Sequence, residues 1–173
     1  MVRFNLKLLI LDVDGVLTNG LIVFDNEDNE YKAFNVKDGL AIRVLSETKV
    51  LKFAIITGRK SKIVEKRARE LLIEDVFQGY RNKLVAYNLL KEKYNLKDKE
   101  IGYIGDDLND LPIIEKVGFF ACPADAPDYI KVKAHYISKK RGGYGAVREI
   151  LEFLVPNFYN IAKDYFLKKT YFE

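Results

Sequence analysis

Two aspartates separated by one residue follow a short apolar run near the start of the chain. Residues 7–18 read KLLILDVDGVLT, so that Asp12 and Asp14 stand directly after the apolar stretch. Such a run predicts a strand over 7–11 that is buried on both faces, as in a parallel sheet covered by helices. Ligands of open α/β sheets bind at the carboxyl ends of the strands. Two carboxylates at that place can hold a hard cation beside a nucleophile.

Four further polar residues are predicted to reach the same edge of the sheet. Thr57 follows the apolar run 53–56, Lys83 lies beside a loop at the start of a predicted helix, and Asp106 and Asp107 follow the run 101–104. Taken alone, an aspartate after a strand is often only a helix cap, and a lysine at a helix start is usually a solvated charge. Like charges that converge on one crevice repel unless a cation joins them. The two acidic groups together therefore predict a metal site.

The remaining chain predicts strands that alternate with helices. Additional strands are expected at 76–77 and 118–121, and helices at 40–48, 61–72, 82–94, 126–131, 146–155 and 158–166. This alternation is typical of a doubly wound, Rossmann-like parallel α/β sheet flanked by helices. A β-hairpin, inserted at about 20–35, is expected from β-like runs at 21–25 and 30–34 around a turn-rich stretch. We expect one domain over 1–156, and an amphipathic helical tail over 157–173.

Composition narrows the class of protein. A length of 173 residues suggests one domain, and 49% hydrophobic and 31% charged residues are typical of a soluble globular protein. The net charge of +4 comes from interleaved acids and bases, so no nucleic-acid partner is expected. The single cysteine excludes an internal disulfide. No apolar leader and no run of about 20 apolar residues is present, so we expect a cytoplasmic protein without a membrane partner.

The polar positions resemble an ordered set of motifs. D-x-D-G-x-x-T at 12–18, Thr57, Lys83 and G-D-D-x-x-D at 105–110 resemble the four motifs of the haloacid dehalogenase superfamily. The resemblance covers most of 8–154, and it includes NVKDGL at 35–40, ITGRK at 56–60 and GGxGAxRE at 142–149. It implies a phosphatase without a cap domain. Lys37 departs from the arginine expected there, keeping the charge but losing the guanidinium fork.

The residues also suit hydrolysis of a phosphate monoester without appeal to the family. That reaction needs an in-line nucleophile, neutralisation of the phosphoryl charge and a proton for the leaving alkoxide. Asp12 is the candidate nucleophile, which would form an aspartyl-phosphate. Asp14 is the candidate acid, and afterwards the base toward water. The Thr57 hydroxyl and the Lys83 ammonium would hold phosphoryl oxygens.

A magnesium ion is the expected cofactor, because it prefers oxygen ligands. The resemblance implies that its protein ligands are the Asp12 carboxylate, the Asp14 main-chain carbonyl and Asp106. Asp107 and Asp110 are expected further from the ion, where they would orient Lys83 or metal-bound water.

The substrate is predicted less directly. Arg59 and Arg67 suit a substrate with both phosphate and carboxylate groups, although a solvent-facing helix charge is an equal alternative for Arg67. The segment before the first predicted helix would contact a sugar acid through Asn35, Val36, Lys37, Asp38 and Gly39. Within the superfamily the chain resembles phosphatases of lipopolysaccharide precursor biosynthesis that act on an eight-carbon 3-deoxy sugar acid. The glycines at 142–145 suggest an active-site flap.

Other functions compete with this interpretation. Phosphatases of another acidic sugar phosphate, such as a nine-carbon sialic acid phosphate, would share every residue that contacts the phosphoryl group. A phospho-aspartate receiver module uses similar chemistry for signalling, but its acids are adjacent rather than spaced D-x-D. A non-catalytic binding protein of the same fold is disfavoured, because every motif residue is present.

The hairpin predicts an oligomer. A lone two-stranded hairpin is marginally stable and exposes unpaired edges. Leu21, Val23 and Tyr31 would be partly exposed to water in a monomer. We expect a homotetramer in which hairpins pair around a symmetry axis and wall the active sites, with the tail helix across a neighbour. The resemblance implies the same assembly.

Overall fold

The computed structural model describes residues 2–168. Within this range, six strands form one sheet in which every pairing is parallel. In spatial order they are β5 (Asp75–Gln78), β4 (Lys52–Thr57), β1 (Leu8–Leu11), β6 (Ile101–Ile104), β7 (Phe119–Cys122) and β8 (Tyr136–Ile137). All four side chains of β1 are fully buried, which explains why this strand has no polar alternation. The predicted doubly wound α/β sheet is confirmed.

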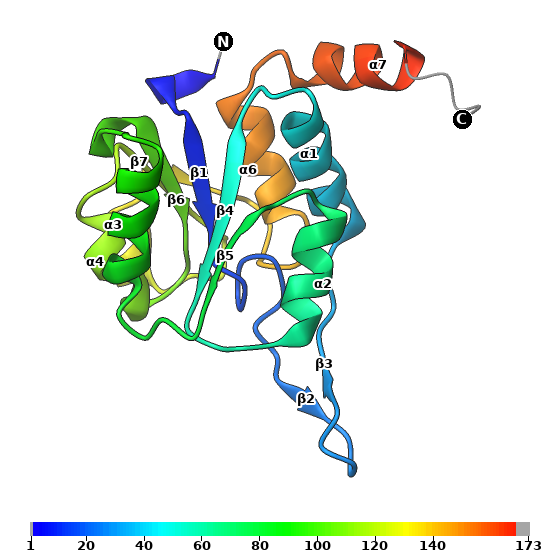
Figure 1. Ribbon diagram of the computed structural model, residues 1–173, viewed down its shortest axis with the longest axis vertical. Coiled ribbons are helices and arrows are strands. Elements are labelled where there is room, and N and C mark those ends of the chain that lie inside the picture. Colours follow the sequence, from blue (N-terminus) through cyan, green and yellow to red (C-terminus); the bar gives the residue numbers. More distant parts are fainter. Residues whose placement is uncertain (1, 169–173) are drawn as a thin grey trace.

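Helices cover both faces of the sheet (Figure 1). One face carries α1 (Val36–Glu47), α2 (Lys62–Glu70) and α6 (Ala146–Leu154), and the other carries α3 (Lys83–Lys93), α4 (Leu111–Ile114) and α5 (Asp128–Lys131). Successive side chains of a strand point to opposite faces. Leu9 and Leu11 therefore pack with the first group of helices, and Leu8 and Ile10 with the second.

The order of the strands reverses next to β1. The chain proceeds from β1 to β4 and β5 on one side, then returns to β6, β7 and β8 on the other. Leu11 pairs with Ile104, and the Asp12 amide donates to the Ile104 carbonyl at 3.0 Å. The residues that follow β1 and β6 are therefore neighbours at the switch point, where open α/β sheets bind ligands.

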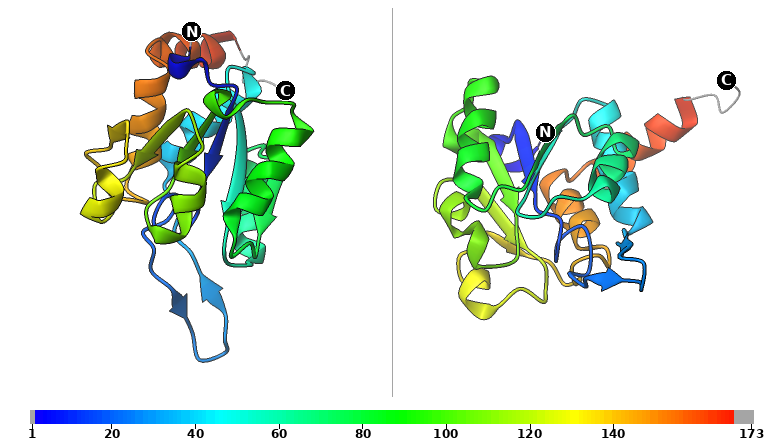
Figure 2. Two further views of the ribbon diagram at one scale, coloured as in Figure 1. Left: turned by 90° about the vertical axis from the view of Figure 1, so that its left-hand side faces the viewer. Right: turned by 60° about the horizontal axis from the view of Figure 1, so that its bottom comes forward.

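The inserted hairpin projects from the same end of the molecule (Figures 1 and 2). Its strands, β2 (Val23–Phe24) and β3 (Glu30–Tyr31), are shorter than predicted, because only two residue pairs form a ladder. The Asp25 carboxylate holds the turn by accepting from the amides of Glu27 and Asn29, each at 2.9 Å.

The helix α1 begins four residues earlier than predicted. The Asn35 side chain caps it by accepting from the amides of Lys37 and Asp38. The Arg67 guanidinium packs directly on the first turns at Gly39, where an ideal Cβ would lie 2.1 Å from Nη2. The short elements α4 and β8, and the 3-10 turns η1 (Arg3–Asn5), η2 (Asp98–Glu100) and η3 (Leu108–Asp110), were not predicted.

The predicted tail helix is present as α7 (Phe158–Lys168), while residues 169–173 lie outside the described range. It packs on its own domain. The Tyr165 hydroxyl donates to the Glu47 carboxylate at 2.8 Å, and the Arg148 guanidinium lies 4.4 Å from the centre of the Phe158 ring. In the described part of the chain, none of the helices combines the length and the apolar character needed to cross a bilayer.

Candidate active site

A buried lysine lies between two carboxylates at the centre of the site. The Lys83 ammonium is 2.6 Å from Asp12 Oδ2 and 2.6 Å from Asp110 Oδ1, and its side chain is fully buried. Lys83 is the first residue of α3, which the Asn82 side chain caps, so it lies at the predicted helix start but is buried rather than exposed. The Tyr103 hydroxyl, which the sequence did not suggest, donates to Asp110 Oδ1 at 2.6 Å. These contacts fix the ammonium beside the tip of β1.

Asp110 also shapes the loop after β6. Its Oδ2 accepts from the Asp106 amide at 2.8 Å and the Asp107 amide at 3.3 Å. A Cβ on Gly105 would lie 2.4 Å from the same oxygen, so glycine provides the necessary room. Asp107 is exposed and accepts from the Leu108 amide. Asp110 thus orients both Lys83 and Asp106, whereas Asp107 caps the following turn.

Three carboxylates converge closely enough for a metal ion. Asp12, Asp106 and Asp110 each offer an oxygen within 4.8 Å of the others. Burial raises the pKa of Asp12 to about 7, and burial together with the Asp12 and Asp110 charges raises the pKa of Asp106 to about 8. One ammonium among three carboxylates leaves an excess of negative charge that a divalent cation would neutralise. An all-oxygen donor set of this kind fits Mg²⁺.

Asp14 faces a different set of partners. Its Oδ1 lies 2.5 Å from the Lys32 ammonium, and its Oδ2 lies 3.9 Å from Arg59 Nε. Lys32 reaches the site from the hairpin, and only 1% of its side chain is exposed. This contact was not predicted, because a single lysine after a short strand has no distinctive pattern.

The two predicted substrate arginines lie in different surroundings. Arg59 Nη2 lies 3.0 Å from Glu30 of the hairpin, close to Asp14. Arg67 packs near the start of α1, with Nη2 3.5 Å from the Asn35 carbonyl and the guanidinium 5.7 Å from the Phe34 ring centre. The Arg67 Nε is buried and has no hydrogen-bond partner among the described residues.

The segment predicted to contact a sugar acid is partly exposed and partly buried. Val36 and Lys37 are exposed on the first turn of α1. Asp38 is only 1% exposed, and its Oδ1 accepts from the Arg148 amide at 2.7 Å, which ties α1 to the start of α6. Thr57, the last residue of β4, is buried at the same sheet edge as Asp12.

The glycine-rich segment predicted as a flap packs on the catalytic loop. The Gly143 amide donates to the Val16 carbonyl at 3.0 Å, and its carbonyl accepts from the Asn35 side chain at 3.2 Å. A Cβ on Gly142 would lie only 1.7 Å from the Gly15 carbonyl oxygen. The segment therefore packs against the catalytic loop as a wall of the site, and its role as a flap stays a prediction.

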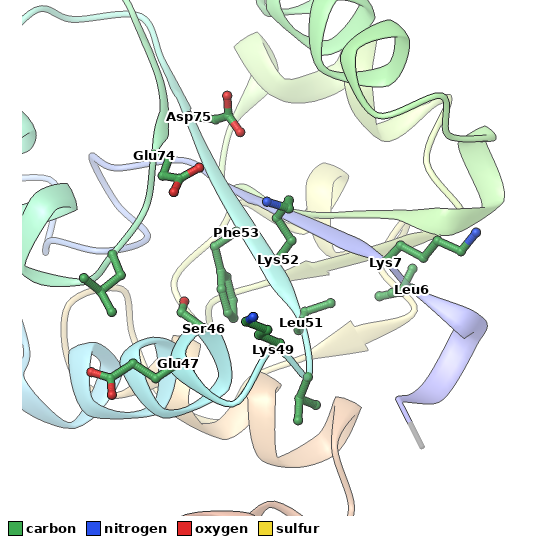
Figure 3. Close-up of a pocket in the computed structure, with 12 residues that line it drawn as sticks. Leu6, Lys7, Ser46, Glu47, Lys49, Leu51, Lys52, Phe53, Glu74 and Asp75 are labelled. Carbon is green, nitrogen blue, oxygen red and sulfur yellow. The ribbon is translucent and has the colours of Figure 1, made fainter.

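A separate hollow lies at the opposite end of the sheet (Figure 3). It is bounded by the end of α1 and the start of β4, including Ser46, Lys52 and Phe53. None of the residues that the motifs predict lines it. Its place at the amino ends of the strands separates it from the chemistry described above.

Comparison with known proteins agrees with this geometry. A family model described as haloacid dehalogenase-like hydrolase matches residues 72–151. The chain is 48% identical over 151 residues to 3-deoxy-D-manno-octulosonate 8-phosphate phosphatase KdsC of Escherichia coli strain K12, covering 87% of this chain and 80% of that protein.

Solved structures are similar over nearly the whole chain. The 3-deoxy-D-manno-octulosonate 8-phosphate phosphatase of Yersinia pestis superposes with a TM-score of 0.86 at 43% identity, covering 91% of this chain and 84% of that one. The phosphatase of the same name from Moraxella catarrhalis, in complex with magnesium ion, phosphate ion and KDO, gives a TM-score of 0.88 at 38% identity. That match covers 93% of this chain and 94% of the other.

A parallel sheet with a carboxylate cluster and a buried lysine at its switch point defines a hydrolase of the haloacid dehalogenase type, as the motifs indicated. Within that class, the chain belongs to the 3-deoxy-D-manno-octulosonate 8-phosphate phosphatase family.

Proposed function

We propose that the protein hydrolyses the phosphate monoester of 3-deoxy-D-manno-octulosonate 8-phosphate, releasing the sugar acid and phosphate, in the synthesis of a lipopolysaccharide precursor. The observation that carries this proposal is the contact of Asp12 with the buried Lys83 beside Asp106. The relative from Moraxella catarrhalis, solved with magnesium, phosphate and KDO, supports the substrate class.

The first half of the reaction forms a phosphorylated enzyme. An Asp12 carboxylate oxygen attacks phosphorus in line with the sugar oxygen, and the bond from phosphorus to that oxygen breaks. The Lys83 ammonium and the Thr57 hydroxyl neutralise and orient the phosphoryl oxygens. Asp14 delivers a proton to the departing sugar oxygen, so that an alcohol leaves rather than an alkoxide.

The second half regenerates the enzyme. Asp14, now ionised, removes a proton from water, which attacks the aspartyl-phosphate and releases inorganic phosphate. Asp12 recovers its carboxylate and Asp14 recovers its proton, so the cycle is balanced. When bound by Asp12, Asp106 and the Asp14 carbonyl, Mg²⁺ would supply charge neutralisation for the transferring phosphoryl group.

Phosphate release is the direct test. The purified protein should hydrolyse the eight-carbon 3-deoxy sugar acid phosphate with a higher kcat/KM than a nine-carbon sialic acid 9-phosphate or glucose 6-phosphate. EDTA and Asp12→Asn should each abolish turnover. Equal kcat/KM values for the three compounds would show a phosphatase without specificity for the eight-carbon sugar acid. Full activity in Asp12→Asn would refute Asp12 as the nucleophile.

A homotetramer is the assembly that we propose for the working enzyme. The projecting hairpin exposes large apolar side chains, which carry fractional exposures of 64% at Leu21, 57% at Phe24 and 54% at Tyr31. Burying such a cluster against copies of itself would remove apolar area and cover the hairpin edges. Light scattering after size exclusion should give about four times the 20.0 kDa chain mass. A fully active monomer at micromolar concentration would contradict this assembly.

We place the enzyme in the cytoplasm, as expected for one that acts on a phosphorylated precursor. Cell fractionation with an antibody to the protein tests this location.

A further inference from the structure

Four charged side chains of alternating sign form a closed ring at the base of the hairpin. Asp14 lies 2.5 Å from Lys32, Lys32 lies 3.4 Å from Glu30, Glu30 lies 3.0 Å from Arg59, and Arg59 lies 3.9 Å from Asp14. Two of these residues belong to the hairpin, one to the loop after β1 and one to the loop after β4. The ring therefore joins the hairpin to the catalytic loop.

Lys32 is the most enclosed member of this ring. Its side chain is 1% exposed, compared with 17% for Glu30, 23% for Asp14 and 42% for Arg59. A charge pair that is shielded from water is stronger and more sharply oriented than a surface pair, which contributes little. The Lys32 ammonium has both acidic members within 4 Å, so its position is determined from two sides.

We propose that Lys32 is a positioning residue for the acid–base chemistry of Asp14, an inference that rests on the proposed phosphatase function. The ammonium holds Oδ1, and Arg59 Nε lies 3.9 Å from Oδ2, so the carboxyl group is oriented from both sides. In the proposed reaction this carboxyl group gives a proton to the sugar oxygen as the bond to phosphorus breaks, and it then accepts a proton from the attacking water. Glu30 pairs with Lys32 and Arg59 pairs with Asp14, and these contacts hold the two side chains in place.

The hairpin then has a role inside the active site of its own chain. Lys32 follows β3 directly, and the Asp25 turn and the two ladder pairs set the register of that strand. A disturbance of the hairpin would therefore reach the chemical step through Lys32, even where the carboxylate cluster of Asp12 and Asp106 stays intact.

Leaving-group dependence provides the test. An alkyl phosphate needs a proton on its departing oxygen, whereas p-nitrophenolate leaves without one, and kcat/KM reports the steps up to that cleavage. Lys32→Met should lower kcat/KM for the sugar acid phosphate roughly 100-fold, which is the lower end of the range for loss of general acid catalysis. For p-nitrophenyl phosphate, the same variant should lower kcat/KM less than about tenfold. Lys32→Arg should recover part of the difference. Glu27→Gln, an exposed change in the same hairpin, should leave both values unchanged.

A double-mutant cycle separates positioning from a general loss of structure. If Lys32 acts through Asp14, adding Lys32→Met to Asp14→Asn should cause little further loss for the sugar acid phosphate. Equal losses on both phosphates, or full additivity in the cycle, would overturn the proposal. If Lys32→Met does not fold, Glu30→Gln can be used instead, because it breaks the ring but keeps the Lys32 ammonium. This variant should lose more activity on the sugar acid phosphate than on p-nitrophenyl phosphate, although by a smaller factor than Lys32→Met. Equal losses on the two compounds would overturn the proposal. A wild-type protein that releases phosphate from neither compound would instead contradict the proposed function.

Discussion

Lys83 and Asp110 form an ion pair of 2.6 Å in which neither side chain has any exposed surface. Asp110 is also joined through its second oxygen to the amide of Asp106, so the pair connects the start of α3 to the loop after β6. The ammonium that contacts the nucleophile is therefore positioned by a residue that is itself fixed by the backbone of the acidic loop.

Removing the lysine should destabilise the protein strongly. Lys83→Met leaves the buried carboxylates of Asp12 and Asp110 without their cation, and breaking a buried pair in this way costs about 3–5 kcal/mol of unfolding free energy. Denaturant unfolding in the presence of EDTA measures this loss of unfolding free energy. Lys91→Met, which breaks an exposed pair with Asp98, should cost less than about 1 kcal/mol. Similar losses in the two variants would contradict the strength assigned to the buried pair.

The stability of the metal-free protein should fall as pH rises. The pKa values of Asp12 and Asp106 are raised from 3.8 to about 7 and about 8, so between these limits the folded state binds protons that the unfolded state has released. Folding is then favoured at low pH, and this contribution is lost as pH rises through about 7 to 8. In EDTA, these two groups should make the free energy of unfolding lower at pH 8 than at pH 5.5.

Magnesium should reverse that trend. Because binding requires ionised carboxylates, it should release protons near pH 7, and the stabilisation by Mg²⁺ should increase with pH. Calorimetric titration in buffers of different ionisation enthalpy counts the released protons. Binding without proton release at pH 7 would show that the carboxylates are already ionised.

Two glycines of the segment at 142–145 should respond differently to alanine. A Cβ at Gly142 meets the Gly15 carbonyl, so Gly142→Ala must displace the loop that carries Asp14 and should lower both kcat and stability. Gly145 has open space but a φ of 99°, so Gly145→Ala should cost about 1–2 kcal/mol of stability with a smaller loss of kcat. Equal kcat in the two variants would argue against the packed wall.

Arg67 should contribute to binding of the sugar acid. Its Nη2 lies 3.5 Å from the Asn35 carbonyl, at the start of the segment predicted to contact the sugar acid. Arg67→Lys keeps the charge but loses the fork, so KM for the sugar acid phosphate should rise roughly tenfold, the value of one charge-assisted hydrogen bond. KM for p-nitrophenyl phosphate should stay constant. Arg43→Lys, at an exposed pair with Glu47, serves as the control.

The sequence by itself determined the architecture and the edge at which chemistry occurs. The unbroken apolar run before Asp12, and the alternation of strands with helices, require a parallel sheet covered on both faces. Parallel strands end at one edge, so Asp12, Thr57 and Asp106 were predicted to lie there from their positions after the strands. Hydrophobic periodicity is a local property, so it can be recognised without any knowledge of distant contacts.

The tertiary structure alone decided which polar groups meet. Lys83 was expected at the start of a helix, but only the structure shows that it is buried between Asp12, which follows β1, and Asp110, which follows β6. Lys32 contacts Asp14 from 18 positions away, and Asp38 accepts from the Arg148 amide 110 positions away. Such contacts depend on where loops leave the sheet and on the register in which helices pack. A charged side chain carries no local signal of its partner, because the free energy that buries it comes from the fold as a whole.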